Sequence, residues 1–477
     1  MSFLNPDSTR VYGAPLQSAN RAFMARYPGD SGRRQPVHTV YGGAHLFQHD
    51  SAFRLGALAL RALEQHAPEW ETFATALGLS VTGDLIHLSR VQRYSADARV
   101  EDPRDVEVGA EPLAHNVYSR VVEKLRREPV EDFRLDYEDG YGNRPDAEED
   151  AHAASGAREV AKGMRMHTLP PFIGLRVKPL NEELRVRSLR TLEIFLTTLL
   201  RESDGELPPN FVITLPKITI PQQVEFFSIA LTALEQALNL KRGTLRFEMM
   251  IETPQVIMSS EGTSALPGIL AAAHGRAIAA HFGTYDYTAG VSITSAHQRM
   301  RHPACDFARN MMQVAFAGTG LWLSDGSTAV LPVGEHPVAD GESLTEEQTR
   351  QNRGSVHRAW KLHYDDIQDS LVRGFYQGWD LHPAQLPTRF AAVYTFFLSG
   401  LDAAADRLRN FVGRAAQATL AGDVFDDAAT GQGLLNFFLR GINCGALTEE
   451  ETLSRTGLTL DELRGRSFLQ ILKNRQQ

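Results

Sequence analysis

The chain has 477 residues, enough for one large domain with appended pieces and too many for a single small domain. Its 58 acidic and 49 basic residues give a net charge of -9, so composition offers no electrostatic reason to expect a nucleic-acid partner. Cys305 and Cys444 suit neither a disulfide framework nor a zinc cluster, and we expect buried thiols. The absence of a signal pattern and of any apolar run of about 18 residues predicts a soluble cytoplasmic protein without membrane contact.

An N-terminal extension, residues 1–35, is polar and loop-rich near its end and leads to a first strand predicted at 37–41. Residues 51–66 have an amphipathic helical pattern, and the section around 67–115 is irregular. From residue 116 helical and strand patterns alternate. The remaining predicted helices are 116–127, 147–165, 182–202, 221–239, 304–317 and 345–376. The remaining predicted strands are 133–137, 172–178, 211–217, 245–252, 277–283, either 321–324 or 329–332, and 378–381.

Eight predicted strands with helices between most of them are the signature of a (β/α)8 TIM barrel, an α/β fold, which we place at 36–395 with an irregular insertion around 67–115. Periodicity alone leaves an open sheet as the alternative. The helix at 182–202 is expected to bury one side, made of Val186, Leu189, Leu192, Leu196 and Leu199.

Beyond residue 390 the strand signals stop, and residues 396–477 are predicted to form a helical C-terminal cap domain. Two capping boxes support helices near the end of the chain, Thr448-x-x-Glu451 and Thr459-x-x-Glu462.

The stretch 245–252 predicts a buried strand that ends on Glu252 and is stopped by Pro254. The active face of a parallel barrel lies where its strands end, so side chains at the other strand ends are expected to meet Glu252. These candidates are Glu138, Asp139, Arg176, Lys178, Lys217 and Asp286.

Carboxylates on neighbouring strands can hold a hard divalent ion, preferably Mg²⁺, and leave positions for water and a bidentate oxygen substrate. Arg176 would then face a substrate carboxylate or a developing enolate, and the backbone N–H groups of Gly283 to Asp286 would face an anion. Structural roles are the alternatives. Glu138 and Asp139 can cap the turn that follows them, and Arg176 can pair with a carboxylate across the barrel.

The order of motifs from about residue 130 to 445 resembles malate synthase and the wider superfamily of citrate lyase β-subunit, malyl-CoA lyase and HpcH/HpaI aldolase. The segments that carry the resemblance are Leu135-Asp136-Tyr137-Glu138-Asp139, Leu175-Arg176-Val177-Lys178-Pro179, Leu215-Pro216-Lys217, Ile251-Glu252-Thr253, Gly283-Thr284-Tyr285-Asp286-Tyr287 and Gly374-x-x-x-Gly378-x-x-x-His382-Pro383. The third-strand segment is closer to the lyases than to malate synthase.

The C-terminal segment Phe425-Asp426-Asp427-Ala428-Ala429-Thr430 is similar to the Glu-Asp-Ala-Ala-Thr segment of malate synthases, with Asp426 in place of the glutamate. In that family the aspartate at the position of Asp427 is the base that deprotonates acetyl-CoA. The structural alternative for Asp427 is a helix N-cap before an Ala-rich turn.

The resemblance implies Mg²⁺-dependent condensation of acetyl-CoA with glyoxylate to malate and CoA, with Mn²⁺ as the alternative ion. Glu252 and Asp286 would hold the ion, and Asp427 and Arg176 would be catalytic. Substrate would also contact the strand-end groups Glu138, Asp139, Gly283, Tyr285 and Asp286.

Three alternatives stay open at this point. The same site can serve a malyl-CoA or citramalyl-CoA-type lyase, or a metal-dependent 2-oxo acid aldolase. Lys178 or Lys217 can instead form the Schiff base of a metal-independent aldolase. The barrel can also bind a metabolite without turning it over. The expected partners are small molecules, a 2-oxo acid such as glyoxylate and an acyl-CoA, and the sequence predicts no oligomeric state.

Overall fold

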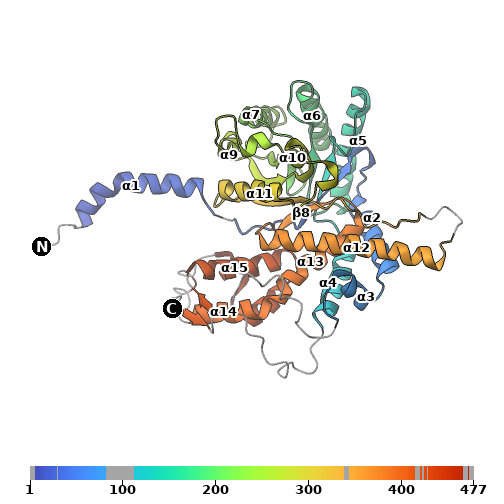
Figure 1. Cartoon of the computed structure of the whole chain (residues 1–477). Helices are drawn as coiled ribbons and strands as arrows, with labels where there is room; N and C mark the ends of the chain where they lie inside the picture. Colours follow the sequence, from blue (N-terminus) through green and yellow to red (C-terminus); the bar gives the residue numbers. More distant parts are fainter. Residues whose placement is uncertain are drawn as a thin grey trace.

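The chain folds around a closed barrel of eight parallel strands, which pair in chain order with the last strand returning to the first. Figure 1 shows how the helices are arranged in the whole chain. The structure is a computed structural model and describes residues 6–29, 31–81, 112–337, 343–413, 419–421, 424–426, 428–465 and 471. The barrel strands are β1 (His38–Gly43), β2 (Asp132–Asp136), β3 (Phe172–Arg176), β4 (Phe211–Leu215), β5 (Arg246–Ile251), β6 (Ala277–Phe282), β7 (Trp322–Ser327) and β8 (Gln377–Asp380). The predicted (β/α)8 barrel is therefore confirmed, and the seventh strand is the first of the two alternatives.

Helices connect the strands and cover the barrel. They are α2 (Ser51–His66), α3 (Trp70–Leu77), α4 (Leu113–Arg127), α5 (Asp146–Met166), α6 (Arg185–Glu202), α7 (Pro221–Ala237), α8 (Pro254–Ile257), α9 (Leu266–Ala272), α10 (Thr284–Gly290), α11 (Pro303–Phe316) and α12 (Glu346–Val372). On α6, Leu192, Leu196 and Leu199 are buried as predicted, whereas Val186 is exposed because it lies on the opposite side of the helix from the buried face that contains Thr191 and Phe195. Helix α3 lies within the section that was expected to be irregular.

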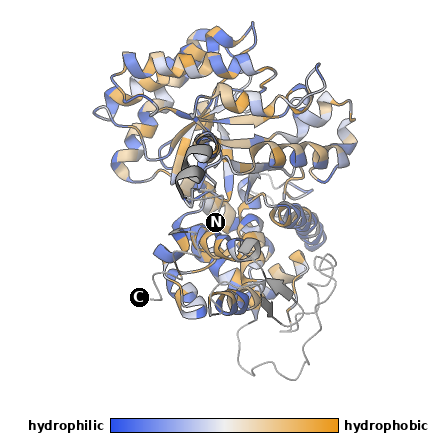
Figure 2. Ribbon diagram, turned by 90° about the vertical axis from the view of Figure 1, so that its left-hand side faces the viewer, coloured by the Kyte–Doolittle hydropathy of each residue, from blue (hydrophilic) through white to orange (hydrophobic). Residues whose placement is uncertain are grey.

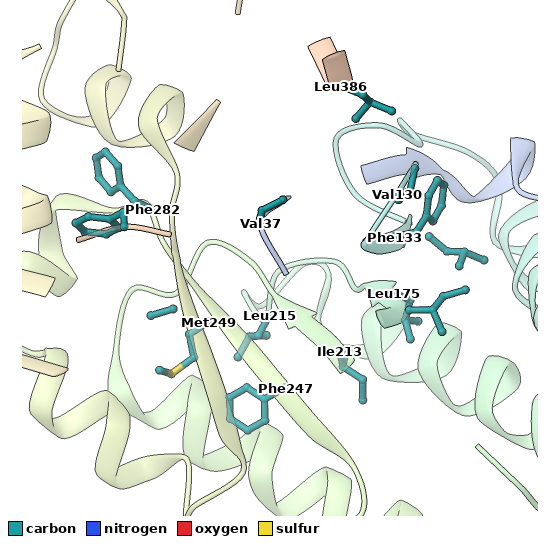
Figure 3. Close-up of a cluster of buried hydrophobic side chains, with 14 of the residues drawn as sticks. Val37, Val130, Phe133, Leu175, Ile213, Leu215, Phe247, Met249, Phe282 and Leu386 are labelled. Atoms are coloured by element: carbon teal, nitrogen blue, oxygen red, sulfur yellow. The ribbon is translucent and has the colours of Figure 1, made fainter. Parts of the chain in front are cut away.

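The barrel strands are buried on both faces, as expected for strands enclosed by helices. Leu175, Ile213 and Phe247 are partners in register on β3, β4 and β5, and they belong to the hydrophobic core that Figure 3 shows. In Figure 2 the barrel strands are mostly orange and the helices around them carry both colours. Because side chains alternate along a strand, this apolar layer leaves the intervening residues to fill the barrel interior.

The barrel interior contains a layer of charged side chains instead of an apolar filling. Arg134 on β2 donates from Nε and Nη2 to the two carboxylate oxygens of Glu248 on β5, both at 3.1 Å. His281 Nε2 on β6 lies 2.8 Å from the same carboxylate, and all three side chains are buried. A buried charge is tolerated only when it is paired, so this layer fixes β2, β5 and β6 relative to one another below the active face.

The C-terminal part contains α13 (Leu386–Ser399), α14 (Leu401–Gly413), α15 (Ala428–Asn443), α16 (Glu449–Thr456) and α17 (Leu460–Gly465). Helix α13 packs on the barrel core, whereas α14, α15 and α17 share a second hydrophobic cluster that includes Leu408, Leu435 and Leu463. Both predicted capping boxes are present, with Thr448 and Thr459 accepting the N–H of the glutamate three residues later. This part is helical as predicted.

Two observations differ from the sequence prediction. A short antiparallel pair, β9 (Thr419–Ala421) and β10 (Val424–Asp426), lies beyond residue 390, where no strand was expected. Strands of three residues are too short to show a period of two. The N-terminal extension contains α1 (Pro6–Arg26), which projects from the body in Figure 1; Pro15 inside it weakens the helical signal. No helix of the described residues is long and apolar enough to cross a membrane.

Glu131, just before β2, ties β1 to the rest of the barrel. Its carboxylate accepts the backbone N–H of Val37 at 2.9 Å and pairs with Lys124 at 2.6 Å and Arg34 at 3.1 Å. Burial opposes ionisation, but Lys124 and Arg34 outweigh it and lower the pKa of Glu131 to about 2. A carboxyl group with a lowered pKa stabilises the fold above its unfolded value of 4.5 and loses that contribution as the pH falls.

We therefore expect Glu131→Gln to lower the free energy of unfolding at pH 7 by about 3 kcal/mol, and by much less at pH 3. Urea unfolding followed by circular dichroism at the two pH values measures this difference. Glu123→Gln, at an exposed helix position, is the control and should leave both values unchanged. A loss that is the same at pH 3 and pH 7 would contradict the assigned charge pairing.

Candidate active site

The predicted site residues follow consecutive strands of the barrel at its carboxyl end. Arg176 is the last residue of β3, and Glu252 directly follows β5. The others are Glu138 and Asp139 after β2, Lys217 after β4, and Asp286 in the first turn of α10 after β6. Because parallel strands end on the same side of a barrel, these residues come together although they are far apart in the sequence.

Arg176 is held by carboxylates at the mouth of the barrel. Its Nε and Nη2 atoms donate to the two oxygens of Asp136, at 2.7 and 2.5 Å, and Nη1 lies 3.0 Å from Glu138 Oε2. The guanidinium also lies over the rings of Tyr41 and Trp379, 4.8 and 5.4 Å from their centroids. Burial disfavours its charge, but Asp136 and Glu138 more than offset this and raise the pKa of Arg176.

Asp136 is a site residue that the sequence prediction did not single out. It is the register partner of Arg176 on the neighbouring strand, and its carboxylate also accepts the backbone N–H groups of Glu138 at 3.0 Å and Gly140 at 2.7 Å. Asp136 thus stabilises the turn that Glu138 and Asp139 were alternatively expected to cap. The signal was available, because Asp132, Arg134 and Asp136 alternate along one strand and so share the interior face.

Glu252 carries a carboxylate that is almost completely buried, with 2% of the residue exposed. Its Oε1 atom accepts the backbone N–H of Lys217 at 2.6 Å. A side chain at Gly283 would collide with Glu252, so the glycine provides the space for this carboxylate. Burial and the nearby negative charge of Asp286 raise the pKa of Glu252 to about 8.

Lys217 connects the carboxylates of the site. Its Nζ atom pairs with Glu138, lies 3.0 Å from Asp139 Oδ2 and lies 3.7 Å from Asp286 Oδ2. Burial lowers the pKa of Lys217, but the surrounding carboxylates, Glu138 first, raise it overall. The ammonium is therefore a protonated cation among acidic groups.

The segment after β6 supplies Asp286, and its other predicted contacts are engaged inside the protein. The N–H of Gly283 donates to the carbonyl of Ile251 at 3.0 Å, so this group is used in the sheet and does not face an anion. The Tyr285 hydroxyl donates to the carbonyl of Ser327 at 2.9 Å and accepts the N–H of Ala329 at 2.8 Å. Tyr285 thereby anchors the start of α10 to the end of β7.

An open pocket adjoins this group and is lined by Lys217, Glu252 and Asp286. Among the described residues, the rest of its wall contains no charged side chain. It is formed by Pro179, Asn181, Thr219, Gln223, Thr253, Pro254, Gln255 and Gly290. Lys178, by contrast, does not line the pocket. Its ammonium donates to the carbonyl of Tyr137 at 2.6 Å and lies 3.1 Å from Glu149 of α5.

The donor set of the pocket fits a hard divalent cation. Glu252 and Asp286 supply carboxylate oxygens from neighbouring strand ends, and Mg²⁺ typically uses one or two carboxylates and completes its coordination with water and substrate oxygens. The described residues contain no group of three His, Cys, Asp or Glu side chains placed to hold a metal. Glu252 and Asp286 would therefore leave most coordination positions to water and ligand.

Two further predictions concern residues elsewhere in the chain. Asp427 lies outside the described residues, between β10 and α15, so its role as the base stays a prediction. Cys305 and Cys444 are free and buried as expected, and burial raises the pKa of each thiol to about 12.

The family model described as "Domain of unknown function (DUF6986)" matches residues 16–471. No curated protein matches the chain. A citrate lyase from Burkholderia xenovorans LB400 aligns with a TM-score of 0.50 and 17% identity, over 72% of this chain and 92% of that chain. A magnesium and glyoxylate complex of Haloferax volcanii malate synthase aligns with a TM-score of 0.41 and 17% identity, over 76% of this chain and 94% of that chain. At 17% identity, the citrate lyase alignment supports the barrel fold and nothing finer.

The burial of Glu252 predicts that the site is a source of instability when no cation is bound. A carboxyl group with a raised pKa costs stability as the pH rises from its unfolded value of 4.5 through about 8. In buffer with EDTA, Glu252→Gln is therefore expected to raise the midpoint of thermal unfolding by about 5 °C at pH 8.5 and to change it little at pH 5.

Differential scanning fluorimetry at both pH values tests this expectation, with the exposed Glu261→Gln as a control that should change neither midpoint. A lower midpoint for Glu252→Gln at pH 8.5 would show that the ionised carboxylate stabilises the metal-free fold, against the expectation.

Proposed function

Because the chain belongs to the DUF6986 family, described as a domain of unknown function, we propose its activity from its site. We propose that it is an Mg²⁺-dependent enzyme of the malate synthase type that condenses acetyl-CoA with glyoxylate and, after hydrolysis of the thioester by water, releases malate and CoA. The proposal combines the motif resemblance from residue 130 to 445 with the carboxylates at the mouth of the barrel.

One observation carries the proposal. Glu252 and Asp286, which the resemblance assigns to the metal, line the same pocket and lie close enough for the charge of Asp286 to raise the pKa of Glu252. Such a pair of acids beside an open pocket is costly unless a cation is shared between them. When bound there, Mg²⁺ would supply a Lewis acid for the carbonyl of a 2-oxo acid.

Arg176 is the group proposed to stabilise negative charge on the enolate and on the alkoxide formed later. Asp136 occupies Nε and Nη2 of the guanidinium and fixes its plane, which leaves Nη1 beside Glu138. Glu138 and Asp139 would orient substrate or water through this arginine and through Lys217. The proton on the acyl methyl group would be removed by Asp427, as the resemblance implies.

The reverse of the condensation step, cleavage of the carbon–carbon bond of a malyl-CoA or citramalyl-CoA-type substrate with its thioester kept intact, is the second candidate, because the third-strand segment Leu175-Arg176-Val177-Lys178-Pro179 is closer to the lyases. A metal-dependent 2-oxo acid aldolase would use the same groups. A Schiff-base aldolase is not favoured, because it needs a neutral amine. The ammonium of Lys178 is paired with Glu149, and the carboxylates around Lys217 raise its pKa.

The assay for this proposal measures release of CoA thiol from acetyl-CoA with and without glyoxylate at saturating Mg²⁺. Release that depends on glyoxylate is expected. Asp286→Asn should reduce kcat/KM by about a hundredfold or more because the amide is a poor ligand for a hard cation. Asp406→Asn, on the exposed side of α14, should retain full activity.

No thiol release under these conditions would overturn the synthase proposal. Glyoxylate production from malyl-CoA in the same preparation would then establish the lyase instead. Full activity in EDTA, with Asp286→Asn unimpaired, would overturn both metal-dependent reactions.

A further inference from the structure

Lys217 contacts both residues proposed to hold the metal, through two different parts of the same residue. Its backbone N–H donates to Glu252 Oε1 at 2.6 Å, and its Nζ atom lies 3.7 Å from Asp286 Oδ2. Among the ion pairs of the described residues, no cation lies closer to Glu252 or to Asp286 than Lys217 does. Lys217 therefore places a cation beside Asp286 and a backbone donor on Glu252, while its ammonium makes its shorter contacts with Glu138 and Asp139.

The charge balance at the mouth explains why an internal cation is needed. Five carboxylates gather here, from Asp136, Glu138, Asp139, Glu252 and Asp286. Arg176 pairs with Asp136 and Glu138. The ammonium of Lys217 also pairs with Glu138, lies 3.0 Å from Asp139 and is the cation nearest to Asp286 among the described ion pairs. Without a second cation, the lysine is the group that keeps these acids together.

The backbone of Lys217 is fixed, so only its side chain can adjust. Lys217 has a φ of +49°, a left-handed conformation that a residue with a Cβ atom rarely adopts. Its N–H bond to Glu252 holds it there, and Thr253 Oγ1 donates to the carbonyl of Ile218 at 2.6 Å, which joins the same two loops again. The residue is held by the proposed metal ligand itself.

The side chain has space to leave the acids. It is 28% exposed and lines the pocket whose wall includes the neutral polar residues Asn181, Thr219 and Gln223. A lysine has a flexible four-carbon stem and a strongly hydrated ammonium, so it can move toward water at little cost when another cation replaces it.

On this basis, and given the metal site of the proposed function, we propose that the Lys217 ammonium is a displaceable counter-ion. It neutralises the acids while no metal is bound, and it withdraws from Asp286 when a divalent cation binds between Glu252 and Asp286. The ammonium of Lys217 and the metal ion compete for the same carboxylates. The lysine therefore weakens metal binding. The lysine also keeps the metal-free mouth folded.

The test uses the full chain and Mn²⁺ as the probe, with its dissociation constant measured by electron paramagnetic resonance. Lys217→Met is expected to bind Mn²⁺ roughly tenfold to a hundredfold more tightly than the unaltered protein, a coupling in the usual range for two linked ligands. In EDTA the same variant should unfold at a lower temperature, and Mn²⁺ should restore the midpoint.

Two further variants separate charge from folding. Lys217→Arg keeps the positive charge and should bind Mn²⁺ with nearly the original affinity. Lys361→Met removes a lysine from an ion pair with Asp365 on α12, remote from the site in the chain, and should change neither affinity nor EDTA stability.

Equal or weaker Mn²⁺ binding by Lys217→Met would overturn the inference. If the unaltered protein still releases CoA in an Mg²⁺-dependent way, the proposed function survives that result. If neither protein binds Mn²⁺, the counter-ion and the proposed metal site are both wrong. If Lys217→Met does not fold, Lys217→Arg provides the test. Mn²⁺ binding by Lys217→Arg that is tenfold or more tighter than that of the unaltered protein would overturn the inference, because this variant keeps the positive charge.

Discussion

Glu252 is buried directly after β5, and its burial and the charge of Asp286 disfavour ionisation of its carboxyl group unless a cation is close by. The loop after β4 supplies one backbone N–H, from Lys217, and Gly283, directly after β6, leaves room for the side chain. Asp286 then adds a second negative charge to the same pocket. Ionised acids held this close together are costly without a nearby cation, and this cost is the basis of the proposed metal site.

The charged layers inside the barrel give this site a rigid base. Arg134 and Glu248 join β2 to β5 deep in the interior, and Arg176 and Asp136 join β3 to β2 one layer above them. Each pair is bidentate and buried, so each fixes the relative position of two strands. The mouth of the barrel is therefore supported by ion pairs, and the apolar residues lie between the strands and the helices.

The sequence was sufficient to predict the barrel and the position of most site residues, because both follow from local patterns. Buried strands appear as continuous apolar runs, and the residue that ends each run must lie on the active face, as Glu252 does. The pairing of Arg176 with Asp136 could not be read in this way, since it depends on which strands are neighbours and on their register.

The remaining discrepancies have similar causes. No sequence pattern indicates the left-handed conformation of Lys217, because lysine normally avoids that conformation. The engagement of the Gly283 N–H by Ile251 follows from the continuation of the sheet by one residue beyond β6. Helix α1 and the hairpin of β9 and β10 were missed because a proline interrupts one and the strands of the other have three residues each.

The central claim is that Glu252 and Asp286 share one divalent cation at the mouth of the barrel. A crystal structure of the protein grown with Mn²⁺, with anomalous differences recorded at the manganese edge, tests it most directly. We predict one anomalous peak in contact with carboxylate oxygens of both residues, with the Lys217 ammonium moved away from Asp286. A peak bound elsewhere, or carboxylates of residues 252 and 286 that contact no common ion at saturating Mn²⁺, would contradict the claim.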